Sequence, residues 1–151
     1  DHPETPAPNR PEGKRSARKT SLDIPKSAGG KRPSSSMTPV ILFENGAPVI
    51  ALGSPGGTQI TSIVLNVLVN LLDFKMNPQD AMAAPRILYR KGPLELEENF
   101  FKNEALIGEL KRTGYEITSR KPFGNAQLIV LRDGRMDGAA DPRGEGKAEG
   151  F

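Results

Sequence analysis

A glycine-rich junction between two apolar segments is the feature that most constrains the fold of this chain. The junction is Gly53–Gly57, with the sequence GSPGG. It follows an apolar run over 48–52 and leads directly into a longer apolar stretch over 58–74. The short run predicts a strand, whereas the long stretch has its apolar residues at helical spacing. The chain therefore has to turn abruptly from strand to helix, and glycines make such a turn possible.

Two short apolar runs predict a β-hairpin at the start of the folded region. They span 39–44 and 47–52, and Asn45-Gly46 separates them. Asn and Gly tolerate the positive φ angles that a two-residue hairpin turn requires. Both runs are almost continuously apolar, so we expect a sheet that is covered on both faces. Because two strands do not make a stable sheet, further strands have to come from later in the chain or from another chain.

The rest of the sequence predicts short helices and short strands. Asn77 followed by Pro78 is typical of a helix start and predicts a helix over 78–84. An amphipathic helix is expected over 103–113, with Gly114 after its end. This order predicts an α+β fold in which helices pack on an antiparallel sheet. The remaining predicted strands are 87–89, 94–97, 115–118 and 126–131, and the tail 138–151 is expected to be a loop.

The N-terminal segment 1–36 differs in composition from the rest of the chain. It contains 8 Lys and Arg against 4 Asp and Glu, 6 of the 14 prolines and no aromatic residue. Such a stretch buries too little apolar surface to offset its ordering entropy, so we expect a flexible or partner-dependent arm. The basic run over 14–19 suits nucleic acid or an anionic surface. Without interleaved aromatic residues, a solvated basic loop is the favoured interpretation.

Residue counts exclude several kinds of chemistry. The chain has no Cys and one His, His2. Disulfides, thiolate catalysis and Cys-ligated zinc are therefore excluded, and a Ser-His-Asp triad is disfavoured. The acidic residues Asp80, Glu95, Glu97 and Glu98 have no recognisable metal-ligand spacing, so we interpret them as solvated and expect neither metal nor cofactor. No apolar run reaches the roughly 18 residues of a membrane span.

Two segments could carry chemistry. Gly56 and Gly57 place free N–H groups at a predicted helix N-terminus, where negative charge is favoured. This suits an oxyanion hole for acyl transfer, and the alternative is a tight turn that binds nothing. Ser34–Ser36, preceded by Lys31 and Arg32, could bind a carboxylate, or could be only a polar loop. No general base accompanies these serines, so they are not interpreted as nucleophiles.

These segments together resemble a known family. Gly30–Pro39 reads GKRPSSSMTP and is followed at the right distance by GSPGG, as in the gamma-glutamyltranspeptidase family. Further matches are APR at 84–86, a strand that contains Gln127, and AADPR at 139–143. Order and spacing agree over 30–151. The resemblance implies that the chain is part of an αββα N-terminal-nucleophile hydrolase sandwich.

The resemblance also implies roles for individual residues. In this family the N-terminal Thr of a small subunit attacks a gamma-glutamyl carbonyl, and water or an amine resolves the acyl-enzyme. By resemblance, Gly56 and Gly57 supply the oxyanion-hole N–H groups. Ser35 and Ser36 hydrogen-bond the α-carboxylate of a gamma-glutamyl small molecule or peptide. The family likeness favours a periplasmic or extracellular location, and no nucleic acid partner is expected.

The sequence departs from the family pattern at its start. It begins Asp1-His2-Pro3 rather than with a Thr, and neither Thr5 nor Thr20 is N-terminal. We therefore expect 37–151 to be the C-terminal part of a small subunit, inactive by itself. Its expected partners are the large subunit and the N-terminal part of the small subunit. The alternative is a non-catalytic remnant that keeps the glutamate pocket, and a basic-armed nucleic-acid binder is a third, disfavoured hypothesis.

Overall fold

The computed structural model describes residues 29–30, 32 and 35–149. The chain divides into Asp1–Pro33 and Ser34–Phe151, and the helices and strands found among the described residues lie in the second unit. Most of the predicted arm 1–36 lies outside the described residues. Within the described residues, no helix is long and apolar enough to cross a membrane.

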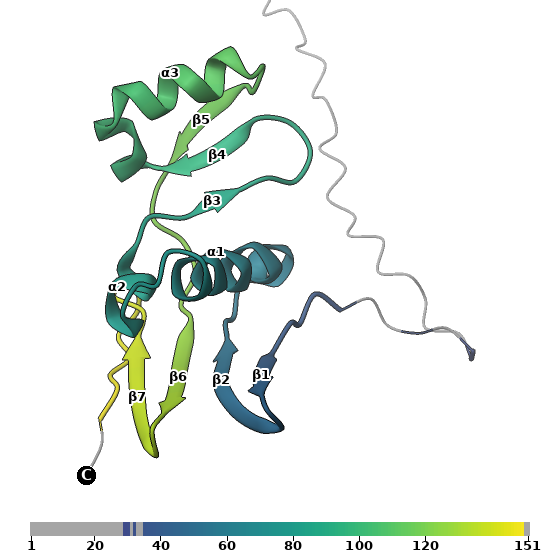
Figure 1. The fold of residues 1–151 in the computed structure, drawn as a ribbon. Coiled ribbons are helices and arrows are strands. Elements are labelled where there is room, and N and C mark those ends of the chain that lie inside the picture. Colours follow the sequence, from purple (N-terminus) through teal and green to yellow (C-terminus); the bar gives the residue numbers. More distant parts are fainter. Residues whose placement is uncertain (1–28, 31, 33–34, 150–151) are drawn as a thin grey trace, which may run out of the picture. The chain divides into compact units, whose positions relative to one another are not determined.

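Four antiparallel strands form the larger sheet, which we call sheet A (Figure 1). The predicted hairpin is confirmed, and Asn45 and Gly46 close it with φ angles of 51° and 83°. The later strand that this hairpin required is β6, which pairs with β2 from Ile50↔Val130 to Gly53↔Gln127. In spatial order the strands are β1 (Val40–Glu44), β2 (Ala47–Gly53), β6 (Gln127–Arg132) and β7 (Arg135–Ala140).

Strand β7 corrects the prediction that 138–151 is entirely a loop. The turn at Asp133 and Gly134 has φ angles of 51° and 73° and sends the chain back along β6. The small residues at the end of β7 show no apolar alternation, which is why the sequence pattern did not reveal a strand. A Cβ on Gly138 would lie 3.0 Å from the Ala148 Cβ, so the small residue leaves room for the tail to cross the strand.

A second sheet, sheet B, differs from the predicted antiparallel arrangement. Its β3–β4 pair is antiparallel, but its β4–β5 pair is parallel. Parallel neighbours require a crossover connection, and helix α3 lies in that connection. The elements are β3 (Ile87–Leu88), β4 (Leu94–Glu97), the 3₁₀ turn η2 (Glu98–Lys102), α3 (Glu104–Arg112) and β5 (Ile117–Arg120).

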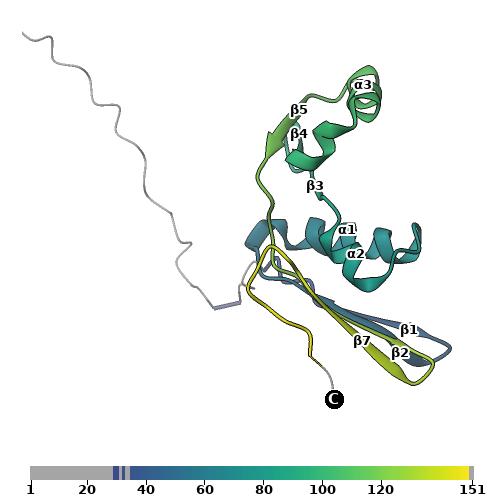
Figure 2. The ribbon, with the colours of Figure 1, turned by 90° about the vertical axis from the view of Figure 1, so that its left-hand side faces the viewer.

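Two helices cover one face of sheet A, as Figure 2 shows. They are α1 (Ile60–Leu72) and α2 (Pro78–Ala83). The predicted cap of α2 is confirmed, because the Asn77 side chain accepts a hydrogen bond from the Asp80 N–H at 2.9 Å. The core between the helices and the sheet is formed by Ile50, Leu52, Ile60, Ile63, Val64, Val67, Met82, Leu88, Phe123, Ala126, Leu128, Val130 and Ala139.

Two asparagines interrupt the apolar sequence of α1, and both bind neighbouring elements. The Asn66 Nδ2 donates to the Ile87 carbonyl at 2.9 Å, and its Oδ1 accepts from the Ile87 N–H at 3.0 Å. The Asn70 Nδ2 donates to the Ala81 carbonyl at 3.2 Å. These bonds satisfy partly buried backbone groups and connect α1 to both β3 and α2.

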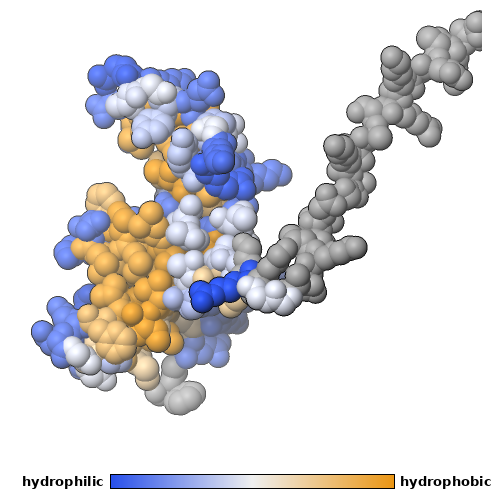
Figure 3. Space-filling view, turned by 90° about the vertical axis from the view of Figure 1, so that its right-hand side faces the viewer, coloured by the Kyte–Doolittle hydropathy of each residue, from blue (hydrophilic) through white to orange (hydrophobic). Residues whose placement is uncertain are grey.

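The apolar surface is less enclosed than the sequence predicts. Leu65 on α1 is 58 % exposed, and Ile41 and Ile129, on the side of sheet A away from the helices, are 62 % and 44 % exposed. Figure 3 shows apolar side chains gathered over α1 and the edge strand β1. Within the described part of the chain, helices therefore cover sheet A on one face only, and the other face carries only part of the C-terminal tail.

Candidate functional site

The GSPGG turn lies between the end of β2 and the start of α1. Gly56 has φ 141° and Gly57 has φ 56°, both in the region that favours glycine. A Cβ on Gly56 would lie 3.1 Å from the Ile63 Cδ1, so a side chain would also be crowded there. A 3₁₀ turn, η1 (Gly57–Gln59), then leads into α1 in place of the first helical residues that the sequence predicts.

One hydrogen bond orients each of the two glycine amides. The Ser54 hydroxyl donates to the Pro55 carbonyl at 2.7 Å, and the Gln59 N–H donates to the Gly56 carbonyl at 3.1 Å. In a trans peptide the carbonyl and the next N–H point in opposite directions. The Gly56 and Gly57 N–H groups therefore point away from these bonds, and neither has an acceptor among the described residues. Free donors before a helix suit an anion.

The serine segment lies at the same end of sheet A as the turn. Because β1 and β2 are antiparallel and Val40 pairs with Leu52, the residues before β1 lie beside the residues after β2. The Thr38 and Thr61 hydroxyl oxygens are 3.3 Å apart, which places the start of β1 against the first turn of α1. The serine segment and the GSPGG turn, which the sequence linked through the family resemblance, thus lie close together in the fold.

The serines themselves are accessible in this arrangement. Ser35 is exposed and its Oγ accepts a hydrogen bond from the Met37 N–H at 3.2 Å, while the Ser36 carbonyl accepts from the Thr38 hydroxyl at 3.0 Å. These bonds shape the segment and leave the Ser36 hydroxyl without a partner among the described residues. Lys31 and Ser34 lie outside the described residues.

Two arginines and two carboxylates form a buried ion cluster that the sequence did not reveal. The Arg86 Nη1 is 2.7 Å from the Asp141 Oδ2, and the Arg143 Nη2 is 2.6 Å from the Glu97 Oε2. Arg143 also approaches the Asp141 Oδ1 at 3.1 Å. Arg86, Glu97 and Asp141 are at most 2 % exposed. Glu97 is therefore not on a solvated face as predicted, because it forms a buried ion pair with Arg143 from a distant segment.

The buried ion cluster also binds backbone groups of several elements. Glu97 accepts from the Arg86 N–H at 3.1 Å and from the Phe123 N–H at 3.0 Å. Arg143 donates to the Met82 carbonyl at 2.9 Å. Arg143 therefore joins Glu97 of β4 to Asp141, which follows β7, near the end of α2. The cluster in this way connects sheet A with sheet B.

The pKa values of three groups in the cluster are shifted. Burial lowers the pKa of Arg86, and the neighbouring Arg143 lowers it further. Burial alone would raise the pKa of Asp141, but the Ala126 N–H and the Arg86 guanidinium bring it below its ordinary value. Burial would lower the pKa of Arg143, but hydrogen bonds to Glu97 and Asp141 raise it overall. Asp141 and Arg143 are therefore held charged, which suits a structural centre better than proton transfer.

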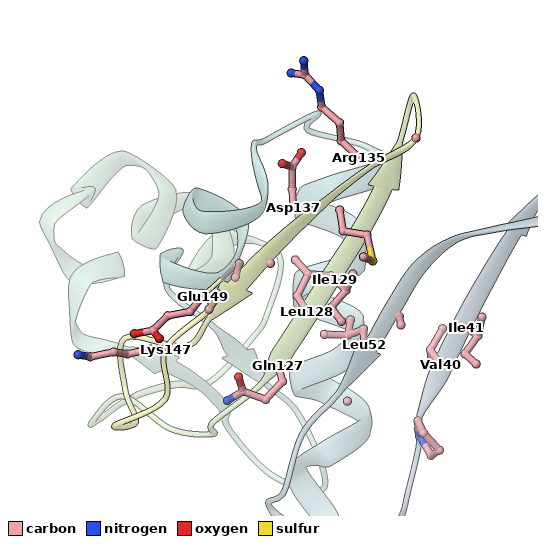
Figure 4. A pocket seen from close by; sticks show the side chains of 18 residues that line it. Val40, Ile41, Leu52, Gln127, Leu128, Ile129, Arg135, Asp137, Lys147 and Glu149 are labelled. Carbon is pink, nitrogen blue, oxygen red and sulfur yellow. The ribbon is translucent and has the colours of Figure 1, made fainter. Parts of the chain in front are cut away.

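A separate hollow lies on the face of sheet A that no helix covers. It has a volume of about 1020 Å³ and is lined along the row Ile41, Ala51, Ile129 and Gly138. In Figure 4, Lys147 and Glu149 lie near one end of the hollow and Ile41 near the other. Gly56 and Gly57 are not part of it. The part of the chain that the structure describes holds no group of three or more His, Asp or Glu side chains placed for a metal.

Comparison with known proteins places these features in a family. A family model described as gamma-glutamyltranspeptidase matches residues 10–151. The glutathione hydrolase proenzyme of Escherichia coli is 37 % identical over 116 residues, which are 75 % of this chain and 20 % of the relative. The acylase ACY 1 proenzyme of a Pseudomonas species is 37 % identical over 121 residues, 79 % of this chain and 21 % of the relative. The chain thus spans about a fifth of the length of these two relatives.

Solved structures agree with the sequence comparison. The gamma-glutamyltranspeptidase of Pseudomonas nitroreducens, in complex with L-DON, has a TM-score of 0.72 and 30 % identity, and the match covers 87 % of this chain and 70 % of that one. Such neighbours confirm the expected α+β class, part of an αββα N-terminal-nucleophile hydrolase sandwich. From its motifs, its fold and the match over nearly its whole length, the chain belongs to the gamma-glutamyltranspeptidase family.

Proposed function

We propose that this chain is the oxyanion-hole and carboxylate-binding part of a gamma-glutamyltransferase or hydrolase. In this proposal Gly56 and Gly57 donate their N–H groups to the oxyanion that forms on the gamma-glutamyl carbonyl. Ser35 and Ser36 bind the α-carboxylate of the same glutamyl group. The observation that carries the proposal is the pair of glycine amides, each oriented by its own hydrogen bond and each without an acceptor among the described residues.

The chemistry follows from where charge develops. When a nucleophile attacks the gamma-glutamyl carbonyl, negative charge moves onto the carbonyl oxygen, and preorganised N–H donors stabilise that charge more than the neutral substrate. The serine segment lies beside the turn, so a glutamyl group can reach both with opposite ends. We propose that the nucleophile, an N-terminal Thr, is supplied outside these 151 residues.

The uncovered apolar surface supports a role within a larger assembly. Ile41, Ile129 and Leu65 expose apolar area that a stable protein usually buries. The matched part of this chain covers only 20 % and 21 % of the two proenzyme relatives described above. We propose that the large subunit and the N-terminal part of the small subunit cover this surface.

The proposal is tested by release of p-nitroaniline from gamma-glutamyl-p-nitroanilide. The chain alone is compared with the same chain preceded by the upstream polypeptide of its own reading frame. We expect release only from the longer protein, and a KM about tenfold higher after Ser36→Ala, because a hydrogen bond to a charged group is lost. Release by the 151-residue chain alone would contradict the proposed external nucleophile.

The main alternative is a non-catalytic module that binds glutamate without turning it over. The same experiment distinguishes it, because a longer protein that binds L-glutamate by calorimetry but releases no p-nitroaniline supports the alternative. Equal KM values for the Ser35→Ala, Ser36→Ala and unmodified proteins would refute the assigned carboxylate contacts.

A further inference from the structure

We propose that Arg120 is a positioning residue for the Gly57 amide and acts through Gln59. The catalytic meaning of this inference rests on the proposed function, but its geometry is tested separately. Arg120 is the last residue of β5 in sheet B, and Gln59 lies in η1, directly after the GSPGG turn. Neither residue belongs to the motifs that identify the family in this sequence.

The Arg120 guanidinium is held on three sides. Its Nη1 donates to the Glu95 Oε2 at 2.9 Å, and its Nη2 donates to the Gln59 Oε1 at 3.3 Å. The guanidinium carbon lies 3.9 Å from the centroid of the Phe123 ring. A planar, forked cation can make these contacts at once, whereas a lysine ammonium cannot reproduce the geometry. Arg120 therefore connects the smaller sheet to the turn.

Phe123, whose ring stacks on the Arg120 guanidinium, is itself held by the buried ion cluster. The Phe123 N–H donates to the Glu97 Oε1 at 3.0 Å, and the Phe123 carbonyl accepts from the Arg86 Nη1 at 2.8 Å. The ring on which the guanidinium stacks thus has both of its flanking backbone groups anchored. The position of Arg120 follows from these anchors as well as from its ion pair with Glu95.

A second contact connects the β5–β6 connection, which contains Phe123, to the GSPGG turn. A Cβ on Gly124 would lie 2.7 Å from the Ile63 Cδ1, and a Cβ on Gly56 would lie 3.1 Å from the same atom. The Ile63 side chain therefore fills the space between the β5–β6 connection and the turn. Ile63 therefore packs against the turn at Gly56, and Arg120 of sheet B binds the Gln59 side chain.

The link from Gln59 to the Gly57 amide is a single peptide plane. The Gln59 N–H donates to the Gly56 carbonyl at 3.1 Å, and the peptide between Gly56 and Gly57 is trans. Fixing that carbonyl fixes the opposite direction of the Gly57 N–H. Arg120 holds the Gln59 side chain, the Gln59 backbone holds the Gly56 carbonyl, and the Gly57 N–H direction follows.

Nuclear magnetic resonance of the ¹⁵N-labelled 151-residue chain tests this inference. The variants are Arg120→Gln, Arg120→Lys, Gln59→Ala and the Arg120→Gln/Gln59→Ala pair. The matched control is Arg112→Gln, since Arg112 is a 76 % exposed arginine paired with Glu109. The readouts are the Gly57 amide shift, hydrogen exchange of the Gln59 N–H, and thermal unfolding.

We expect both Arg120 variants to move the Gly57 signal and to accelerate Gln59 exchange about tenfold, the value of one charge-assisted hydrogen bond. Exchange in β6 and all signals of the Arg112→Gln control near the turn stay unchanged. In the Gln59→Ala background, Arg120→Gln adds no further shift at Gly57. Arg120→Lys keeps a positive charge beside Glu95 and is expected to remain folded. If Arg120→Gln unfolds the chain, the Gly57 shift and the Gln59 exchange rate are taken from Arg120→Lys.

Two results would overturn the inference. One is an unchanged Gly57 shift and Gln59 exchange rate in both Arg120 variants. The other is an equal Gly57 shift with and without the Gln59 side chain, which would mean that Arg120 acts through general packing. Failure here leaves the proposed oxyanion role standing, because only the source of the orientation is refuted. Failure of the p-nitroaniline assay leaves the resonance result standing.

Discussion

Replacing Asp141 by Asn should strongly destabilise the chain, although the two side chains have nearly the same shape. Asp141 is 0 % exposed and its two oxygens receive four donors: the Ala126 N–H and Arg86 Nη1 on Oδ2, and the Arg143 N–H and Nη1 on Oδ1. An Asn amide has to present its NH₂ to one of these two pairs. In either orientation the NH₂ group, itself a donor, faces two other donors. Arg143 keeps Glu97 as a carboxylate partner, whereas the Arg86 guanidinium loses its only ion pair among the described residues.

The expected cost follows from the loss of one partner in a buried ion pair, about 3–5 kcal/mol. For a domain of this size that corresponds to a fall in Tm of roughly 10–20 °C. Thermal unfolding followed by circular dichroism measures it, with Arg112→Gln as an exposed control expected to stay within about 2 °C. A Tm for Asp141→Asn as close to the unmodified chain as that of the control would refute the assignment of the cluster as a structural centre.

The same substitution changes the acid limb of the stability curve. The pKa of Asp141 is lowered from its ordinary 3.8 in the folded state. Its contribution is therefore complete above about pH 4 and is lost as pH falls through the lowered folded pKa. Urea unfolding between about pH 2 and 5 should show a steeper decline for the unmodified chain than for Asp141→Asn. Parallel curves would show that Asp141 is not the titrating group.

Three further substitutions test the contacts of α1, the turn and, for comparison, an open glycine position in α3. Asn66→Leu should cost about 2–4 kcal/mol in urea unfolding, because both backbone groups of Ile87 lose their partner; a cost below about 0.5 kcal/mol would show that water replaces the side chain. Gly56→Ala should cost about 1–3 kcal/mol because of its φ of 141°. Gly108→Ala in α3, where a Cβ meets nothing within 4 Å, should instead stabilise by about 0.5–1 kcal/mol, and equal effects of the two changes would refute the strain argument.

Local patterns predicted the hairpin, the Asn77 cap and the strand-to-helix turn because the residues that determine them are neighbours in sequence. Asn45-Gly46 sets its own backbone, and Asn77 caps a helix that begins at the next residue. Resemblance to a family brought the serine segment and the GSPGG turn together, and the antiparallel β1–β2 pair then placed them at one end of sheet A.

Features that depend on distant residues were not predictable in the same way. Glu97 follows an alternating stretch that is typical of a half-solvated strand, and only its meeting with Arg143 explains its burial. β7 escaped notice because Gly138 and its small neighbours carry no apolar period. Arg86 and Arg143 belong to the APR and AADPR motifs, but the sequence assigned them no role. The presence of an arginine in each motif was the only sequence signal for the cluster.

The strand order of sheet A has a consequence for the order of folding. β2 and β6 are neighbours in the sheet, and Gly53 pairs with Gln127. In the sequence, α1, α2 and the whole of sheet B lie between these two strands. Closing so long a connection costs entropy before the pairing returns any free energy, and contacts of this kind slow folding. Until β6 arrives, the free side of β2 is a strand edge open to other chains. The step most prone to misassembly is therefore the late docking of the β6–β7 hairpin onto β2.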